Sequence, residues 1–213
     1  MKIIAREYKV YNYSELSEEA KEKAKQWYLD DDFKPQEFTE IYMENLRYLF
    51  PNSDLKLQYS LGYCQGDGLN IYGKLDVVDL LSFIRENKDF SCMEQFKNAL
   101  TEKEVKTIEA YIEVCGRKID LPYNNGHYEY CVSDRTEFAC DWVEELEYQM
   151  YKNIQVDIIR KLENLVRDMF TTLSGQYEEY GYDFFYEVDE KTMEEVCEAN
   201  EWMFLEDGTY FSA

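Results

Sequence analysis

Several residue types and motifs are scarce or missing in this sequence of 213 residues. It has one histidine and three prolines, and its six cysteines include no CxxC pair. With so few paired nitrogen and sulfur ligands, a zinc site is not expected. We expect no metal site and no cofactor. Neither the full motif GxxxxGK[ST] nor GxGxxG occurs, so a phosphate-binding loop is not expected. No stretch approaches the roughly 20 apolar residues of a membrane span, and the first residues lack the apolar core of a signal peptide.

Positive charge is the other scarcity. The chain has 23 basic and 45 acidic residues, which gives a formal net charge of −22. Such a charge repels nucleic acid and anionic membranes, so we expect direct contact with neither. A partner protein with a basic surface is the electrostatic expectation, although acidity can also serve solubility alone.

The composition is that of a folded protein. Hydrophobic residues make up 45% of the chain and aromatic residues 16%, with twenty tyrosines. No linker, repeat or low-complexity segment interrupts the sequence, and its length suits one sizeable core. We therefore expect a single domain over residues 1–213.

A hairpin over residues 55–75 is the clearest local prediction. Apolar residues alternate with polar or small ones in LKLQYSLGY and again in LNIYGKL. Between them lies CQGDG, in which Gly66 and Gly68 permit a positive φ and Asp67 can bond to its own backbone.

Other elements follow from period and capping signals. Helices are expected over 16–28, with Ser17 as N-cap, from Pro35 to Leu49, over 77–84 and over 92–100. The segment 2–13 is expected to be an opening strand. Capping-box spacing at Thr101 permits a helix, but the alternation after it favours a strand over 107–115.

The second half is expected to complete an α+β fold. The segment His127–Ser133 is read as a strand, making a second hairpin with 107–115. From about Glu137 the apolar period becomes that of one long helix or two nearly collinear ones. A short helix after Asp189 and a terminal hairpin over 202–211 follow. The predicted fold is an antiparallel sheet built on hairpins, covered by a long C-terminal helix and shorter N-terminal helices.

Acidic residues are concentrated near the C-terminus. Twelve acids and a single lysine lie between Glu178 and Asp207, among tyrosines and phenylalanines. The aromatics are either core residues under the long helix or part of a docking surface, since tyrosine is typical of interface hot spots. The candidate acidic docking surface comprises Glu178, Glu179, Asp183, Glu187, Glu190, Glu194 and Glu198.

A second candidate site is a polar pocket. If both predicted hairpins share one sheet, Gln65, Asp67 and His127 meet at one edge and form a binding pocket for a small nucleotide. An Asp–His pair is the minimum for acid–base chemistry, but we assign no catalytic residue. The alternative is purely structural, with Asp67 and the glycines serving the turn. A basic pocket built by Lys9, Lys56, Lys74, Arg117 and Lys118 is a further possibility for a nucleotide.

Four segments, in order, resemble a family of small phage and prophage accessory proteins. They are YNYSELSEEAKEKAKQWY, YCQGDG, GHYEY and CEANEWMFLEDGTYF. Members are often labelled antitoxins of a toxin–antitoxin stability system. The resemblance implies a phage or mobile-element protein in the cytoplasm of a bacterial host. It supplies no catalytic residue, although positions 65–68 and His127 match the family pattern.

These observations favour a non-enzymatic accessory protein. We expect it to bind and inhibit a host defence protein through the acidic, tyrosine-rich surface, for example as a DNA mimic of the anti-CRISPR or anti-restriction type. The alternatives are a sponge for nucleotide signals or an antitoxin, using the pocket near the QGDG turn. A hydrolase is the least favoured class.

Overall fold

The structure is a computed structural model that describes residues 6–30, 32, 34–85, 91–123 and 135–212. Its backbone divides into two units. Unit 1 comprises Met1–Phe38 and Tyr182–Ala213, and unit 2 comprises residues 39–181. Each unit is described by itself, and the single domain over residues 1–213 stays a prediction.

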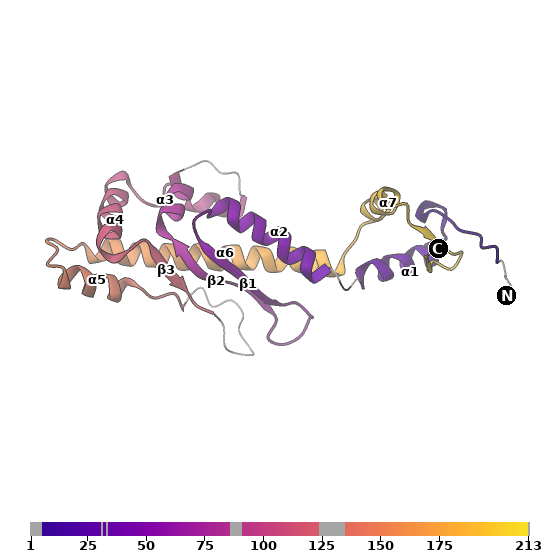
Figure 1. Cartoon of the computed structure of the whole chain (residues 1–213), viewed down its shortest axis with the longest axis horizontal. Coiled ribbons are helices and arrows are strands. Elements are labelled where there is room, and N and C mark those ends of the chain that lie inside the picture. The colour runs from indigo at the N-terminus through magenta and orange to yellow at the C-terminus, as the bar shows by residue number, and fades with distance from the viewer. Residues whose placement is uncertain (1–5, 31, 33, 86–90, 124–134, 213) are drawn as a thin grey trace, which may run out of the picture. The chain divides into compact units, whose positions relative to one another are not determined.

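The central hairpin of unit 2 is confirmed (Figure 1). Strand β1 (Asp54–Ser60) pairs antiparallel with β2 (Gly68–Asp76), and Leu57 lies opposite Ile71. Ile71 is fully buried, whereas Leu57 is half-buried. The apolar alternation predicted this register because a slip of one residue would turn every apolar side chain to the other face.

A third strand completes the sheet. Strand β3 (Lys118–Leu121) pairs antiparallel with β2, which gives the order β1-β2-β3. Gly73, at the centre of β2, has φ 117°, and a Cβ there would lie 2.2 Å from the carbonyl oxygen of Asp54. Only glycine permits this close approach of the two strands.

The strand predicted over 107–115 is wrong, because this segment lies in helix α4 (Glu102–Cys115). Thr101 caps the helix: its Oγ1 accepts from the backbone N–H of Glu104, whose carboxylate accepts from the N–H of Thr101. Ile108 and Ile112 are buried together with Val105 and Tyr111. Residues four apart satisfy both a period of two and a helical face, so the alternation was ambiguous. The predicted strand His127–Ser133 lies outside the described residues.

Helices cover the sheet, as predicted for an α+β fold. Unit 2 contains α3 (Val77–Arg85), the 3-10 helix η2 (Ser91–Phe96), α5 (Ala139–Tyr148) and most of α2 (Lys34–Leu49) and α6 (Val156–Tyr186). Phe50, just after α2, packs against Phe170 of α6 with ring centroids 5.4 Å apart. The long helix α6 is the predicted C-terminal cover (Figure 1).

Helices α5 and α6 are not collinear. Between them Met150 and Asn153 adopt positive φ angles of 55° and 59°, and the chain turns back. The carboxylate of Glu163, in α6, accepts hydrogen bonds of 2.7 Å from the backbone N–H groups of Phe138 and Ala139 at the start of α5. An acidic side chain from one helix thus caps the N-terminus of the other.

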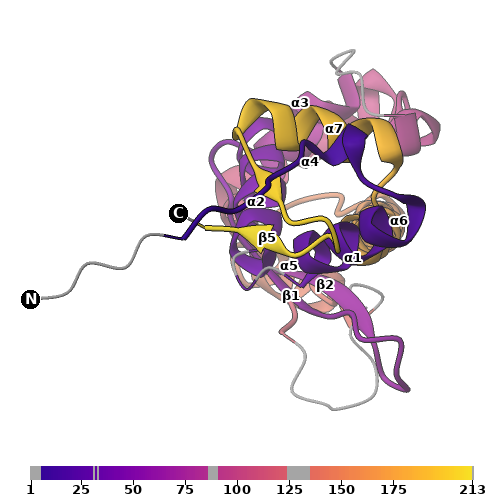
Figure 2. The ribbon, with the colours of Figure 1, turned by 90° about the vertical axis from the view of Figure 1, so that its right-hand side faces the viewer.

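Unit 1 is built from both ends of the chain (Figure 2). It contains the 3-10 helix η1 (Tyr13–Glu15), α1 (Glu18–Leu29), α7 (Glu190–Ala199) and the hairpin of β4 (Met203–Phe204) and β5 (Tyr210–Phe211). Ser17 and Asp189 are the N-caps, as predicted. The strand predicted over 2–13 does not form over the described residues of this segment, which contain one isolated antiparallel bridge, between Tyr11 and Phe204. The core consists of Tyr13, Leu16, Ala20, Ala24, Met193, Cys197 and Phe204.

Candidate functional site

The QGDG turn is held together by its own aspartate. Asp67 Oδ2 accepts hydrogen bonds from the backbone N–H groups of Gly62, at 2.6 Å, and Cys64, at 2.9 Å, while Oδ1 accepts from Ser60 Oγ at 3.1 Å. Gly66 has the predicted positive φ, at 96°. The Asp67 carboxylate therefore stabilises the loop, as the structural alternative requires.

The structure describes two of the three residues of the predicted polar pocket. Gln65 is exposed, Asp67 is half-buried, and His127 lies outside the described residues. A hydrogen bond from Cys64 to Asp67, together with burial, raises the pKa of the Cys64 thiol. A thiol with a raised pKa stays protonated at neutral pH and is a poor nucleophile.

The seven acids of the predicted docking surface do not share one environment. Glu178 and Glu179 belong to unit 2, and the other five belong to unit 1. Glu178 is half-buried beside the backbone N–H of Leu69, and burial, with the nearby charge of Asp67, raises its pKa. The other six, Glu179, Asp183, Glu187, Glu190, Glu194 and Glu198, are exposed.

Helix α7 presents its acids on one side. Met193 and Cys197 are buried in the core of unit 1, while Glu194 and Glu198, four residues apart, are exposed. Residues at this spacing share a helix face. Glu190 pairs with Lys21, and Glu195 pairs with Lys191 at 3.1 Å. In the described part of the chain, no cation pairs with Glu194 or Glu198.

These acids line a groove of about 600 Å³ between η1 and α7. We call it the acidic groove; its acidic residues are Glu194, Glu195, Glu198 and Glu201. Tyr13 also lines it and is 1% exposed, and its hydroxyl has no hydrogen-bond partner among the described residues. Burial raises the pKa of Tyr13 to about 12, with a smaller contribution from Glu190. The hydroxyl therefore stays protonated at neutral pH.

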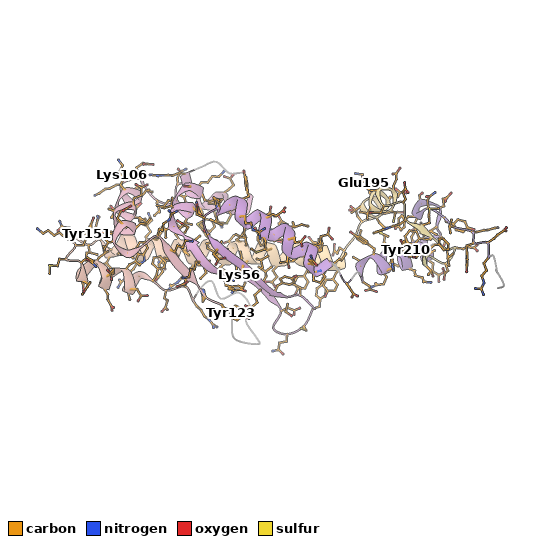
Figure 3. All side chains as sticks on the ribbon, in the orientation of Figure 1. Lys56, Lys106, Tyr123, Tyr151, Glu195 and Tyr210 are labelled. Atoms are coloured by element: carbon orange, nitrogen blue, oxygen red, sulfur yellow. The ribbon has the colours of Figure 1, made fainter. Side chains whose placement is uncertain are left out.

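A second cavity of unit 1, of about 680 Å³, is lined by four half-buried aromatic residues. We call it the aromatic pocket; its rings are those of Trp27, Tyr28, Trp202 and Tyr210. Trp202 also lines the acidic groove, so the two cavities adjoin. Figure 3 labels Tyr210 on β5 and Glu195 on α7 among the side chains of this unit. Sequence reasoning missed the pocket because its rings come from the two ends of the chain.

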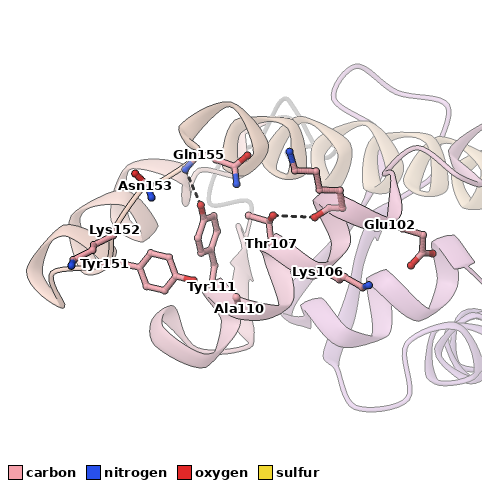
Figure 4. A pocket seen from close by; sticks show the side chains of 10 residues that line it. Glu102, Lys106, Thr107, Ala110, Tyr111, Tyr151, Lys152, Asn153 and Gln155 are labelled. Atoms are coloured by element: carbon pink, nitrogen blue, oxygen red, sulfur yellow. Dashed lines mark hydrogen bonds between the residues drawn. The ribbon is translucent and has the colours of Figure 1, made fainter.

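Unit 2 contains a hollow lined by lysines, of about 670 Å³ (Figure 4). Lys103 and Lys106 come from α4, and Lys152 from the turn before α6. Between them the buried Tyr111 accepts a hydrogen bond of 2.8 Å from the backbone N–H of Gln155 and meets Tyr151 edge to face. Among the residues that the structure describes, none of the three lysines is in an ion pair.

The five basic residues considered from the sequence do not line this hollow. Arg117 pairs with the buried Asp76 at 2.7 Å, and Lys118 donates to the carbonyl of Asn52 at 3.1 Å. Lys56 and Lys74 are exposed on β1 and β2, and Lys9 belongs to unit 1.

Among the described residues, no group of three or more His, Cys, Asp or Glu side chains is placed to hold a metal ion. None of the described helices has the length and apolar character needed to cross a membrane.

Comparison with known proteins adds no neighbour. No protein-family model matches the chain. No curated protein matches it, and no solved structure does.

Proposed function

We propose that this protein is a non-catalytic binding protein that occupies a basic surface of a partner protein through the acidic groove of unit 1. The observation that carries the proposal is that three glutamates of the groove have no described cation partner. They are Glu194, Glu198 and Glu201. All three are exposed and line one groove, and none has a cation partner in the described part of the chain. They can pair with a partner's Lys or Arg without first breaking an existing ion pair.

Charge and surface chemistry support this reading. The net charge of −22 attracts a basic partner and speeds its encounter. The groove also offers the half-buried ring of Trp202. Tyrosine and tryptophan are typical of the residues that carry most of the energy of an interface.

We further propose that the partner is a host defence protein and that binding inhibits it, with the protein acting in a bacterial cytoplasm. The resemblance to phage accessory proteins supports this setting. Glutamates held along α7 present negative charge to a basic surface much as phosphates do, so a nucleic-acid-binding groove is the specific target of the DNA-mimic form.

The test combines affinity capture from a bacterial host with a matched pair of charge reversals. One variant carries Glu194→Lys, Glu198→Lys and Glu201→Lys. Its control carries Glu113→Lys, Glu144→Lys and Glu147→Lys on exposed positions of unit 2. Both change the net charge equally, so only a local role of the groove separates them.

We expect the wild type and the control to capture the same partner and the groove variant to lose it. Capture should weaken as salt rises, because the Debye length falls from about 10 Å at 0.1 M to about 3 Å at 1 M. Equal capture by both variants refutes the groove as the binding surface. If the partner holds double-stranded DNA and this protein at once, the DNA-mimic form is wrong.

A second candidate function is binding of a nucleotide or another phosphate compound in the lysine hollow. Three lysines without described ion pairs, beside an exposed tyrosine ring, favour an anion in an otherwise acidic protein. Calorimetry with mononucleotides and cyclic dinucleotides tests it, with Lys106→Gln as the weakened variant and Lys56→Gln as the control. Absence of heat across the panel excludes it. Binding that survives Lys106→Gln but not Asp67→Asn would instead support a pocket at the QGDG turn.

A further inference from the structure

The aromatic pocket has rings set at right angles. Trp27 stacks on Tyr210, with centroids 4.2 Å apart and planes 10° apart. Trp202 stands across this stack, at 80° to Trp27 and 76° to Tyr210. The rings that line the pocket therefore lie in two nearly perpendicular orientations.

The rim of the pocket is acidic. Asp30 and Asp32 line it, both exposed, and neither is in an ion pair with a described residue. Asp30 only accepts a hydrogen bond of 2.8 Å from Gln26. Lys23 also lines the rim, but its ammonium group is held by Asp207 and Thr209, each at 2.7 Å. Asp207 thus offsets the charge of Lys23, and the carboxylates of Asp30 and Asp32 can interact with a cationic ligand in the pocket.

We propose that the aromatic pocket binds an arginine side chain of the partner protein; this rests on the proposed function. A guanidinium group is flat, stacks on aromatic faces and donates hydrogen bonds in a fork that fits a carboxylate. Stacked rings beside unpaired aspartates meet both requirements. Arginine is also enriched among the residues that dominate interfaces.

Other occupants fit the pocket less well. An apolar side chain would leave the two carboxylates without a cation partner among the described residues. A quaternary ammonium group is attracted to indole faces but has no proton to donate to a carboxylate. One ring of the pocket already has a cation on it, because Lys34 Nζ lies 4.4 Å from the centroid of Tyr28. That contact occupies Tyr28, so the two indoles and Tyr210 are the rings that the arginine would meet.

Intrinsic fluorescence gives a direct test on the intact protein. Two of the three tryptophans line the pocket, and Trp142, 5% exposed in unit 2, provides a constant background. The probe is the capped tripeptide Gly-Arg-Gly. Its matched control replaces arginine by citrulline, which has nearly the same shape and no charge. Tetramethylammonium chloride is the third ligand.

The arginine peptide should change the emission with saturation, and the citrulline peptide should bind at least about tenfold more weakly, because cation–π attraction and the carboxylate pair both need the charge. Combining Asp30→Asn with Asp32→Asn should weaken arginine binding by about tenfold. Asparagine keeps the acceptor for Gln26, so the end of α1 is preserved. Glu22→Gln, an exposed change on α1 outside the pocket, should leave binding unchanged.

Three results would overturn the proposal outright, and a fourth would replace it by another kind of site. They are equal binding of the arginine and citrulline peptides, no response to the arginine peptide, and full binding by the double aspartate variant. Tighter binding of tetramethylammonium than of the arginine peptide would also overturn it, in favour of a quaternary ammonium site. The titration needs no partner protein. Its failure is therefore distinct from failure of the proposed function, which the charge reversals in the acidic groove test separately.

Discussion

Asp79 is a buried carboxylate on which the packing of unit 2 depends. It is 3% exposed, in the first turn of α3, and holds the turn between α2 and β1. Its Oδ2 accepts hydrogen bonds of 2.8 Å from the backbone N–H of Asn52 and from Ser53 Oγ, and Oδ1 accepts one of 2.7 Å from Asn52 Nδ2. No cation among the described residues pairs with it, so these donors and the N-terminus of α3 stabilise its charge.

Replacing Asp79 by alanine should cost about 3 kcal/mol of unfolding free energy. The change removes three hydrogen bonds to a carboxylate, two from the exposed residue Asn52 and one from Ser53, and a typical intramolecular hydrogen bond contributes about 0.5–1.5 kcal/mol. Ser53 Oγ keeps its other bond, which it accepts from the N–H of Asp76 at 2.9 Å. Asp79→Asn should cost only about 1 kcal/mol, because one oxygen remains and the amide of Asn52 can rotate to accept from the new NH₂ group.

Urea unfolding measures both variants. The emission of Trp142, buried in unit 2, reports on this unit in a background that carries Trp27→Phe and Trp202→Phe. Asp120→Ala, at an exposed position of β3, is the control and should stay within about 0.5 kcal/mol of the background. If alanine at position 79 costs less than about 1 kcal/mol, or asparagine costs as much as alanine, the reasoning about the three hydrogen bonds is wrong.

Three further predictions concern burial and charge. Ile71→Asp should abolish the cooperative thermal transition of unit 2, whereas Leu57→Asp, at a half-buried position, should only lower its midpoint; a normal melt of the first variant would contradict the burial argument. A hydrogen bond from Lys161 is the main reason that the pKa of Glu104 falls from 4.5 to about 2. The ionised Glu104 therefore contributes to the unfolding free energy above pH 4.5, and this contribution is lost as the pH falls toward 2. Glu104→Gln should therefore reduce the acid sensitivity of the unfolding free energy in that window, by less than about 1 kcal/mol because the pair is partly exposed. Burial raises the pKa of Glu178, so its ionised form opposes folding at neutral pH; Glu178→Gln should melt above the wild type at pH 7 and at the same temperature near pH 3, and a lower melting temperature at pH 7 would contradict this.

The sequence by itself determined the elements whose causes are local. Ser17 and Asp189 cap helices that begin where the sequence places them, and the hairpin of β1 and β2 has the register that its alternation predicts. Helix caps and apolar alternation involve residues a few positions apart, so the sequence alone predicts them. The strand predicted around Ile108 and Ile112 was wrong because the apolar spacing of this segment fits both a strand and a helix. Burial against the rest of unit 2 selected the helix.

Only the tertiary structure decided the candidate sites. The sequence showed an acidic segment, but not that Glu194 and Glu198 lack described cation partners while Glu190 and Glu195 have them. The aromatic pocket joins Trp27, near the N-terminus, to rings of the C-terminal hairpin. Such contacts depend on packing between segments far apart in the chain, and no local period or capping signal encodes which aromatic side chains will meet. The fold class was therefore readable from the sequence, whereas the pairing of charges and the assembly of rings were set by how unit 1 closes on itself.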